Sequence, residues 1–194
     1  FRDFSSYKFL RHTVGKTLAE RRAHAGKLNI WCAACSSGQE AYSVSIMLND
    51  AMPQFKDWDI NILATDVSSA LIRRAKEGIF NQTEVNRGLP ASILIKHFDR
   101  EGTIWKVHDK HRQAIKFQVF NLMNTWEDLP TFDIILLRNV LLYFQPSDQF
   151  RILKKLRAHM HEDSYLFLSK GERPVKNDFL KLRSEEKDAC FQNF

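Results

Sequence analysis

The stretch LNIWCAACSSGQEAYS, residues 28–43, decides the fold of this 194-residue chain. It opens with an apolar run, passes through small residues and one glycine, and regains apolar residues at helical spacing from Ala41 to Leu48. This pattern predicts a strand, a tight loop and a helix. Small residues such as Ala34 and Gly38 would let a ligand approach the backbone, and the start of the helix offers unpaired N–H groups. The unit predicts a ligand site at the carboxyl edge of a parallel sheet, although any βα turn can carry one glycine.

Strands and helices alternate along most of the chain, judged by the spacing of the apolar residues. We expect strands at 28–33, 60–66, 132–137 and 165–168, and helices at 4–23, 38–51, 68–76 and 147–161. Such alternation predicts an α/β fold with a doubly wound sheet. Right-handed crossovers make neighbouring strands parallel, so that their carboxyl ends face one crevice.

The alternation loosens between residues 79 and 120. A short helix is expected at 90–98, followed by a strand at 102–107, GTIWKV. We expect this strand to pair with residues 115–120. The region 79–120 would then hold a small antiparallel β-subdomain that departs from the main sheet.

The composition fits one domain spanning residues 1–194. Hydrophobic residues make up 44% of the chain, enough for one full core with little left over. We expect residues 1–26 to form a helical lead-in, and two short strands at 179–183 and 189–194 to close the fold as a hairpin. No uncharged apolar run approaches the length of a membrane span, so we expect a cytoplasmic protein without membrane insertion.

Charge and cysteine content narrow the class of partner and the compartment. A net charge of +6 favours an anionic partner, such as nucleic acid, a phospholipid surface or an acidic protein. Three cysteines are too few for a disulfide framework, which fits a reducing compartment. Cys32 and Cys35 match C-x-x-C, but a zinc site needs further ligands and Cys190 stands alone. We therefore expect packing cysteines and no metal.

Asp66 falls at the carboxyl end of the second predicted strand. In nucleotide-type folds, an acidic residue there accepts hydrogen bonds from both ribose hydroxyls, which an amide cannot do. The alternative is an N-cap for the next helix. Ser68 and Ser69 are better placed for that capping, so the spacing favours a ribose-binding carboxylate.

Other candidate residues follow the same strand-end pattern. Glu40 lies in the first turn after the glycine loop, where it could either complement the positive helix end or bind a ligand ammonium or hydroxyl group. Asn121-Leu122 follows the strand at 116–120, where an asparagine could read an adenine edge or simply make a turn. Arg138-Asn139 directly follows another strand and is expected to line the crevice. Tyr143 comes next, although an aromatic residue in an apolar run is usually core.

Five blocks of the sequence, in this order, resemble the CheR family of chemotaxis receptor methyltransferases, and together they extend over nearly the whole chain. The blocks are FRD at 1–3, WCAACSSGQEAYSVSIML at 31–48, ATDVSSALIRRAKEGIF at 64–80, FNL at 120–122 and FDIILLRNVLLYF at 132–144. Members of this family use S-adenosylmethionine (SAM) to methylate glutamate side chains.

The resemblance implies a class I SAM-dependent methyltransferase with a Rossmann-like, mostly parallel seven-stranded sheet. It places the cofactor-binding positions at Arg2, Ala34, Gly38, Glu40, Asp66, Asn121, Leu122, Arg138 and Asn139. Arg2 matches the arginine of the family motif Asn-x-Thr-x-Phe-Phe-Arg, whose asparagine and threonine would precede Phe1. Gln39 replaces the first acidic residue of the family's Gly-Glu-Glu, and Glu40 matches the second.

The implied reaction transfers a methyl group to glutamates on the acidic methylation helices of chemoreceptors and releases S-adenosylhomocysteine (SAH). Arg138 and Tyr143 are the expected catalytic residues. The segment DREGTIWKV at 99–107 looks shorter than in members whose β-subdomain grips a receptor pentapeptide. We therefore expect recruitment without that tether, by a monomer that binds no nucleic acid.

Other readings compete with this one. A nucleic-acid methyltransferase on the same fold would suit the basic charge, but base N-methylation usually uses an Asn/Asp-Pro-Pro-aromatic turn, which residues 138–141 do not resemble. A small-molecule methyltransferase and a non-catalytic SAM-binding sensor are further alternatives.

Overall fold

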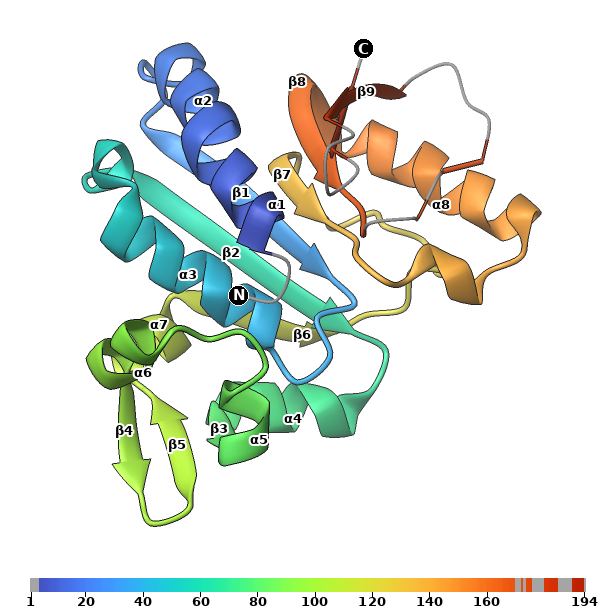
Figure 1. The fold of residues 1–194 in the computed structure, drawn as a ribbon. Helices are drawn as coiled ribbons and strands as arrows, with labels where there is room; N and C mark the ends of the chain where they lie inside the picture. Colours follow the sequence, from blue (N-terminus) through green and yellow to red (C-terminus); the bar gives the residue numbers. More distant parts are fainter. Residues whose placement is uncertain (1–3, 170–171, 173, 176–179, 185–189, 194) are drawn as a thin grey trace.

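A seven-stranded sheet forms the centre of the protein in a computed structural model that describes residues 4–169, 172, 174–175, 180–184 and 190–193 (Figure 1). Across the sheet, the strands are β6 (Ile115–Val119), β2 (Asp59–Asp66), β1 (Lys27–Ala33), β7 (Phe132–Leu136), β8 (Met160–Phe167), β10 (Cys190–Asn193) and β9 (Leu180–Ser184). The pairings from β6 to β8 are parallel, and β10 is antiparallel to both its neighbours. The predicted α/β class and the closing hairpin are therefore confirmed.

Helices cover both faces of the sheet, because successive side chains of each strand point to opposite faces and the apolar ones on both faces need burial. The helical segments on the main sheet are α1 (Phe4–Phe9), η1 (Leu10–Val14, a π-helical turn), α2 (Gly15–Arg21), α3 (Gln39–Ala51), α4 (Ser69–Glu77) and α8 (Pro146–Ala158). On β1, Ile30 and Cys32 pack with α1 to α4 in one core cluster, whereas Trp31 packs with α8 in the other. This two-sided burial is the pattern expected of a doubly wound sheet.

The region 79–107 forms a separate three-stranded antiparallel sheet, which projects from the main body in Figure 1. Its strands are β3 (Ile79–Asn81), β5 (Ile104–Val107) and β4 (Phe98–Glu101), in that order, and short helices α5 (Gln82–Val85), α6 (Ala91–His97) and α7 (Asp109–Gln113) flank them. The small subdomain is confirmed, but the pairing predicted for it is wrong. Residues 115–119 are strand β6 of the main sheet, since Ile115 and Phe117 are buried in the first core cluster.

A buried chain of polar groups ties the small subdomain to α3. His97 Nε2 lies 2.7 Å from Asp50 Oδ2, His97 Nδ1 lies 2.9 Å from His111 Nε2, and His111 Nδ1 lies 2.9 Å from Ser45 Oγ. Each neutral ring can donate one hydrogen bond and accept one, with all donors pointing toward Asp50. If both rings carried a second proton, His97 Nδ1–H and His111 Nε2–H would face each other, so the chain cannot hold two charged histidines.

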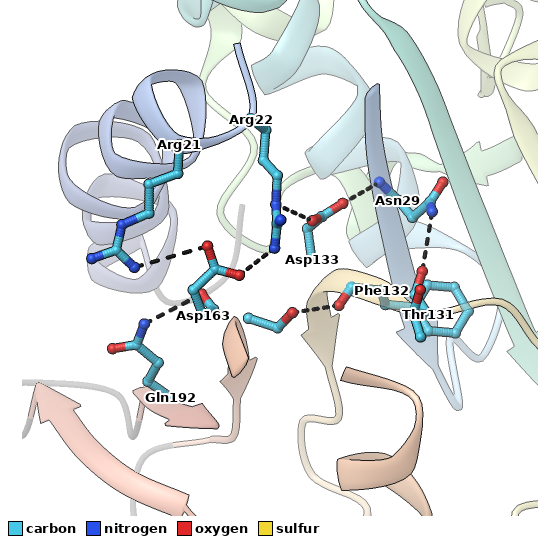
Figure 2. A network of polar contacts seen from close by, with 9 residues as sticks. Arg21, Arg22, Asn29, Thr131, Phe132, Asp133, Asp163 and Gln192 are labelled. Atoms are coloured by element: carbon cyan, nitrogen blue, oxygen red, sulfur yellow. Dashed lines mark hydrogen bonds and ion pairs between the residues drawn. The ribbon is translucent and has the colours of Figure 1, made fainter. Parts of the chain in front are cut away.

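A second polar network fixes the lead-in helices to strands β1, β7 and β8 of the main sheet. Arg22 lies between Asp133 and Asp163, with Nε 3.2 Å from Asp133 Oδ1 (Figure 2). The other oxygen of Asp133 accepts the backbone N–H of Asn29 at 2.8 Å. Because Asp133 is buried, both of its oxygens need these partners. The network therefore fastens α2, β1, β7 and β8 together.

The Asp133 network predicts a large loss of stability from one substitution. Asp133→Ala leaves the N–H of Asn29 without its acceptor and removes one of the two carboxylates that pair with Arg22, and should lower the free energy of unfolding by about 3 kcal/mol. Asp59→Ala is the matched control, since Asp59 pairs with Lys27 at an exposed site and should cost under about 1 kcal/mol. Urea denaturation measures both, and equal losses would contradict the role assigned to Asp133.

The histidine chain predicts that acid weakens the fold. Burial lowers the pKa of His111 to about 4, below its ordinary value of 6.5. The unfolded chain therefore binds a proton as the pH falls from about 7 toward 4 while the folded chain does not, so stability decreases over that window. We expect a loss of about 1 to 2 kcal/mol between pH 7.5 and 5. In His111→Gln that loss should shrink; an unchanged pH profile would contradict this assignment.

Candidate functional site

The loop after β1 takes a conformation that few residues tolerate. Ala34 and Ser36 have positive φ angles of 57° and 53°, and Gly38 has φ 91°. A Cβ on Gly38 would lie 3.1 Å from Cβ of Ala75, a tight contact that adds to the preference of this backbone conformation for glycine. The side of Gly38 thus faces the core, while Ala34 and Ser36 line a cavity.

Asp66 holds this loop in place. One carboxylate oxygen accepts the N–H of Ser36 at 2.9 Å, and the other accepts the N–H of Ser68 at 2.9 Å. Ser68 caps α4 by accepting a hydrogen bond from Leu71 N, as the sequence predicted. Because a carboxylate oxygen has two lone pairs, both oxygens of Asp66 can accept a second hydrogen bond from a ribose diol.

Glu40 and Arg138 form an ion pair at the centre of the site. Glu40 comes from the first turn of α3 and Arg138 from the loop after β7, and Nη1 lies 3.0 Å from Oε1. Their side chains are 18% and 7% exposed. Burial at this depth strengthens the attraction, and the pair joins the ends of two strands that neighbour each other in the sheet.

Glu172, which the sequence analysis did not single out, holds the loop after β7. Its carboxylate accepts the backbone N–H groups of Asn139, Val140, Leu141 and Ser169 at 2.8 to 3.1 Å. Asn139 itself has a positive φ of 59°. The strand-end rule could have found it, since Glu172 follows the strand that ends at Phe167, as Arg138 follows β7.

These two loops open onto a cavity of about 330 Å³. Of the predicted site residues, it brings together Ala34, Glu40, Arg138 and Asn139. Residues of α1, α3 and the small subdomain complete its walls: Tyr7, Tyr42, Ser43, Ile46, Phe80, Glu84, Val85, Arg87, Leu89 and Phe98.

Tyr7 is a wall residue that sequence reasoning missed. It lies in α1 and is buried beside Glu40, and this burial together with the negative charge of Glu40 raises the pKa of Tyr7 far above its usual value. The hydroxyl therefore stays protonated and can donate a hydrogen bond. Nothing in the apolar spacing of residues 4–23 distinguished Tyr7 from the other core positions of that helix.

Asn121 and Leu122 lie farther along the same sheet edge. Asn121 Oδ1 accepts the N–H of Met123 at 2.9 Å, and its exposed side chain borders a second hollow of about 1050 Å³ that Val67 also lines. Leu122 is buried against Trp126 in the second core cluster. Its carbonyl accepts a hydrogen bond from Lys155, so Leu122 shapes the turn through packing.

Five of the predicted residues that the structure describes do not line this cavity: Gly38, Asp66, Asn121, Leu122 and Tyr143. Tyr143 is 79% exposed and does not line it, so a catalytic role for Tyr143 stays a prediction. Arg2 falls outside the described residues. Cys32, Cys35 and Cys190 are buried free thiols, and burial raises the pKa of Cys35 to about 12, which suits a packing role.

The order of these groups along the sheet edge fits an adenosyl cofactor. Asn121 follows β6, Asp66 ends β2, the loop of Ala34 follows β1, and Arg138 follows β7, which is the strand order of the sheet. An adenine, a ribose diol and a charged amino-acid end would meet an amide, a carboxylate and an ion pair in turn. The fold is that of a class I SAM-dependent methyltransferase domain, and the order of these groups fits that class.

Comparison with known proteins agrees with this class. The sequence profile described as "CheR methyltransferase, SAM binding domain" matches residues 1–188. The chain therefore belongs to the CheR methyltransferase family, and the cofactor of this domain is SAM. A TehB-like SAM-dependent methyltransferase from Corynebacterium glutamicum shares the fold, with a TM-score of 0.52 and 15% identity over 93% of this chain and 98% of the other.

Curated relatives are more similar in sequence. Chemotaxis protein methyltransferase 1 of Pseudomonas aeruginosa is 34% identical over 89% of this chain, and the Cher2 protein of Pseudomonas putida is 33% identical over 89%. This chain spans 64% of the length of each. Among the described residues, no helix is both long and apolar enough to cross a bilayer.

The position of Asp66 predicts the strength of cofactor binding. Asp66→Ala removes the carboxylate expected to accept from the ribose and also releases the N–H of Ser36, so the Kd for SAH should rise at least about tenfold. Isothermal titration calorimetry measures this change. The control is Asp57→Ala, at an exposed position outside both hollows. An SAH affinity that survives Asp66→Ala would remove the centre of the predicted site.

Proposed function

We propose that this chain is the methyl-transferring domain of an enzyme that esterifies glutamate side chains of chemoreceptors. The observation that carries the proposal is the buried Glu40–Arg138 ion pair on the cavity wall, where the first turn of α3 meets the loop after β7. Relatives also support the proposal, because two proteins that are 33–34% identical to this chain are named chemotaxis protein methyltransferases.

The acceptor needs alignment more than activation. A glutamate carboxylate is ionised at neutral pH and is already a nucleophile, so the site requires no strong general base. When bound, SAM supplies an electrophilic methyl group: a new O–CH₃ bond forms as the S–CH₃ bond breaks, leaving a neutral methyl ester and SAH. The residues of the chain must hold the carboxylate in line and exclude water from it.

Arg138 is suited to orienting the acceptor. A free arginine would bind a carboxylate so tightly that its nucleophilicity falls, but Glu40 already compensates much of the guanidinium charge. Arg138 can then direct one carboxylate oxygen without immobilising it fully. Tyr143, exposed on the same loop, would contact the receptor helix that carries the glutamate.

The partners we propose are the acidic methylation helices of cytoplasmic receptor domains, which the basic charge of the chain complements. We also propose a cytoplasmic monomer that binds no nucleic acid and is recruited without a pentapeptide tether. The observation that supports recruitment without a tether is the short connection between β4 and β5, which reverses at Gly102. Measurable binding of a receptor's terminal pentapeptide to residues 79–120 would refute the recruitment proposal.

Methyl transfer can be tested directly with methyl-labelled SAM and an acidic receptor fragment. The expected result is label on glutamate that mild base releases as methanol, because a methyl ester is base-labile. Arg138→Ala should lower kcat/KM by about 100-fold, since it removes a charged group from the reacting centre. Arg151→Ala, an exposed arginine paired with Asp148, should leave the rate unchanged. Base-stable label, or SAH binding without label transfer, would overturn the proposed function.

A further inference from the structure

Strained backbone is concentrated at the site. Within the described part of the chain, the non-glycine residues with positive φ are Ala34, Ser36 and Asn139, and all three line the same cavity. Such conformations are unfavourable for residues other than glycine and persist only where surrounding contacts impose them. Hydrogen bonds must therefore hold the loops after β1 and β7 in place. In each loop a buried carboxylate accepts them, Asp66 for the first and Glu172 for the second.

Glu172 supplies those contacts for the loop after β7. One oxygen accepts from Val140 at 2.9 Å and Leu141 at 3.1 Å, and the other accepts from Asn139 at 2.8 Å and Ser169 at 2.9 Å. Four backbone donors thus converge on a side chain that is only 9% exposed. A charged acceptor makes each of these hydrogen bonds stronger than a neutral acceptor would.

The position of Glu172 separates it from groups that touch substrate. It does not line the cavity, whereas Arg138 and Asn139 do. The loop that it holds turns Arg138 inward to Glu40 and leaves Leu142 and Tyr143 exposed, 57% and 79%, on the outside. The carboxylate of Glu172 therefore fixes both the inward direction of Arg138 and the outward direction of Leu142 and Tyr143.

We propose that Glu172 is a positioning residue for methyl transfer, acting through the loop 138–143. It sets the place of Arg138 relative to the acceptor carboxylate and presents Leu142 and Tyr143 to the incoming receptor helix. This inference rests on the proposed function, because the acceptor is the glutamate named there.

Glu172→Gln tests the proposal at nearly constant volume. An amide has one acceptor oxygen, and its NH₂ group would face two backbone N–H donors, so at least two of the four hydrogen bonds must break. Since small displacements of an aligning group are costly, we expect kcat to fall about 30-fold or more. The Kd for SAH should rise by a smaller factor than kcat falls, because Asp66 and the β1 loop stay in place while Arg138 and Asn139 shift.

Ser169→Ala is the matched control. Ser169 donates its backbone N–H to Glu172, but its buried Oγ has no hydrogen-bond partner among the described residues. Removing the hydroxyl therefore perturbs the same spot and spares the carboxylate cluster, so kcat should stay within about twofold of wild type. Glu172→Asp keeps the charge and both oxygens, and should recover part of the activity that Glu172→Gln loses.

Hydrogen exchange distinguishes this inference from the proposed function. In Glu172→Gln, the amides of Asn139, Val140 and Leu141 should exchange at least about tenfold faster than in wild type, with no change in Ser169→Ala. If the wild-type protein transfers no methyl group to receptor fragments, the proposed function fails, and faster exchange still supports the role of Glu172 in holding the loop.

Two results would overturn the positioning role. One is unchanged exchange of the three amides in a folded Glu172→Gln protein. The other is faster exchange with a kcat equal to that of wild type. Should Glu172→Gln fail to fold, the same two measurements on Glu172→Asp decide the question, with a smaller expected loss of kcat.

Discussion

Unpaired backbone N–H groups at the ends of parallel strands are the constraint on which this structure depends. Where a strand stops and its loop turns sharply, the amides lose the partners that the ladder supplied, and buried amides need acceptors. Here two carboxylates supply them, Asp66 for the β1 loop and Glu172 for the β7 loop. Both loops border the same cavity, so the groups that satisfy the backbone also fix the geometry of the site.

The remainder of the fold keeps these loops in register. The parallel sheet brings the ends of β1 and β7 side by side, and the core clusters on its two faces prevent either strand from shifting. At the opposite end, Arg22 and Asp133 join the lead-in helices to the same strands (Figure 2). The small subdomain, anchored through His97 and His111, closes the cavity from the side.

Local sequence rules were sufficient where a residue's place follows from the strand that precedes it. Glu40, Asp66 and Arg138 were predicted because strand ends of a parallel sheet share one edge, and the structure brings Glu40 and Arg138 into contact. Strand pairing failed at residues 102–107, because sequential neighbours were expected to pair. The main sheet instead takes residues 115–119, whose inward Ile115 and Phe117 need burial beneath helices.

The position of Tyr7 bears on where the structural domain begins. The sheet begins only at Lys27, yet one wall of the cavity comes from α1, which precedes every strand. A domain boundary drawn at the first strand would remove this wall together with the core residues Leu10, Val14 and Leu18, and would open the pocket to water. The lead-in helices therefore belong to the same structural unit as the sheet, and a fusion protein that is meant to keep the cavity closed must include them.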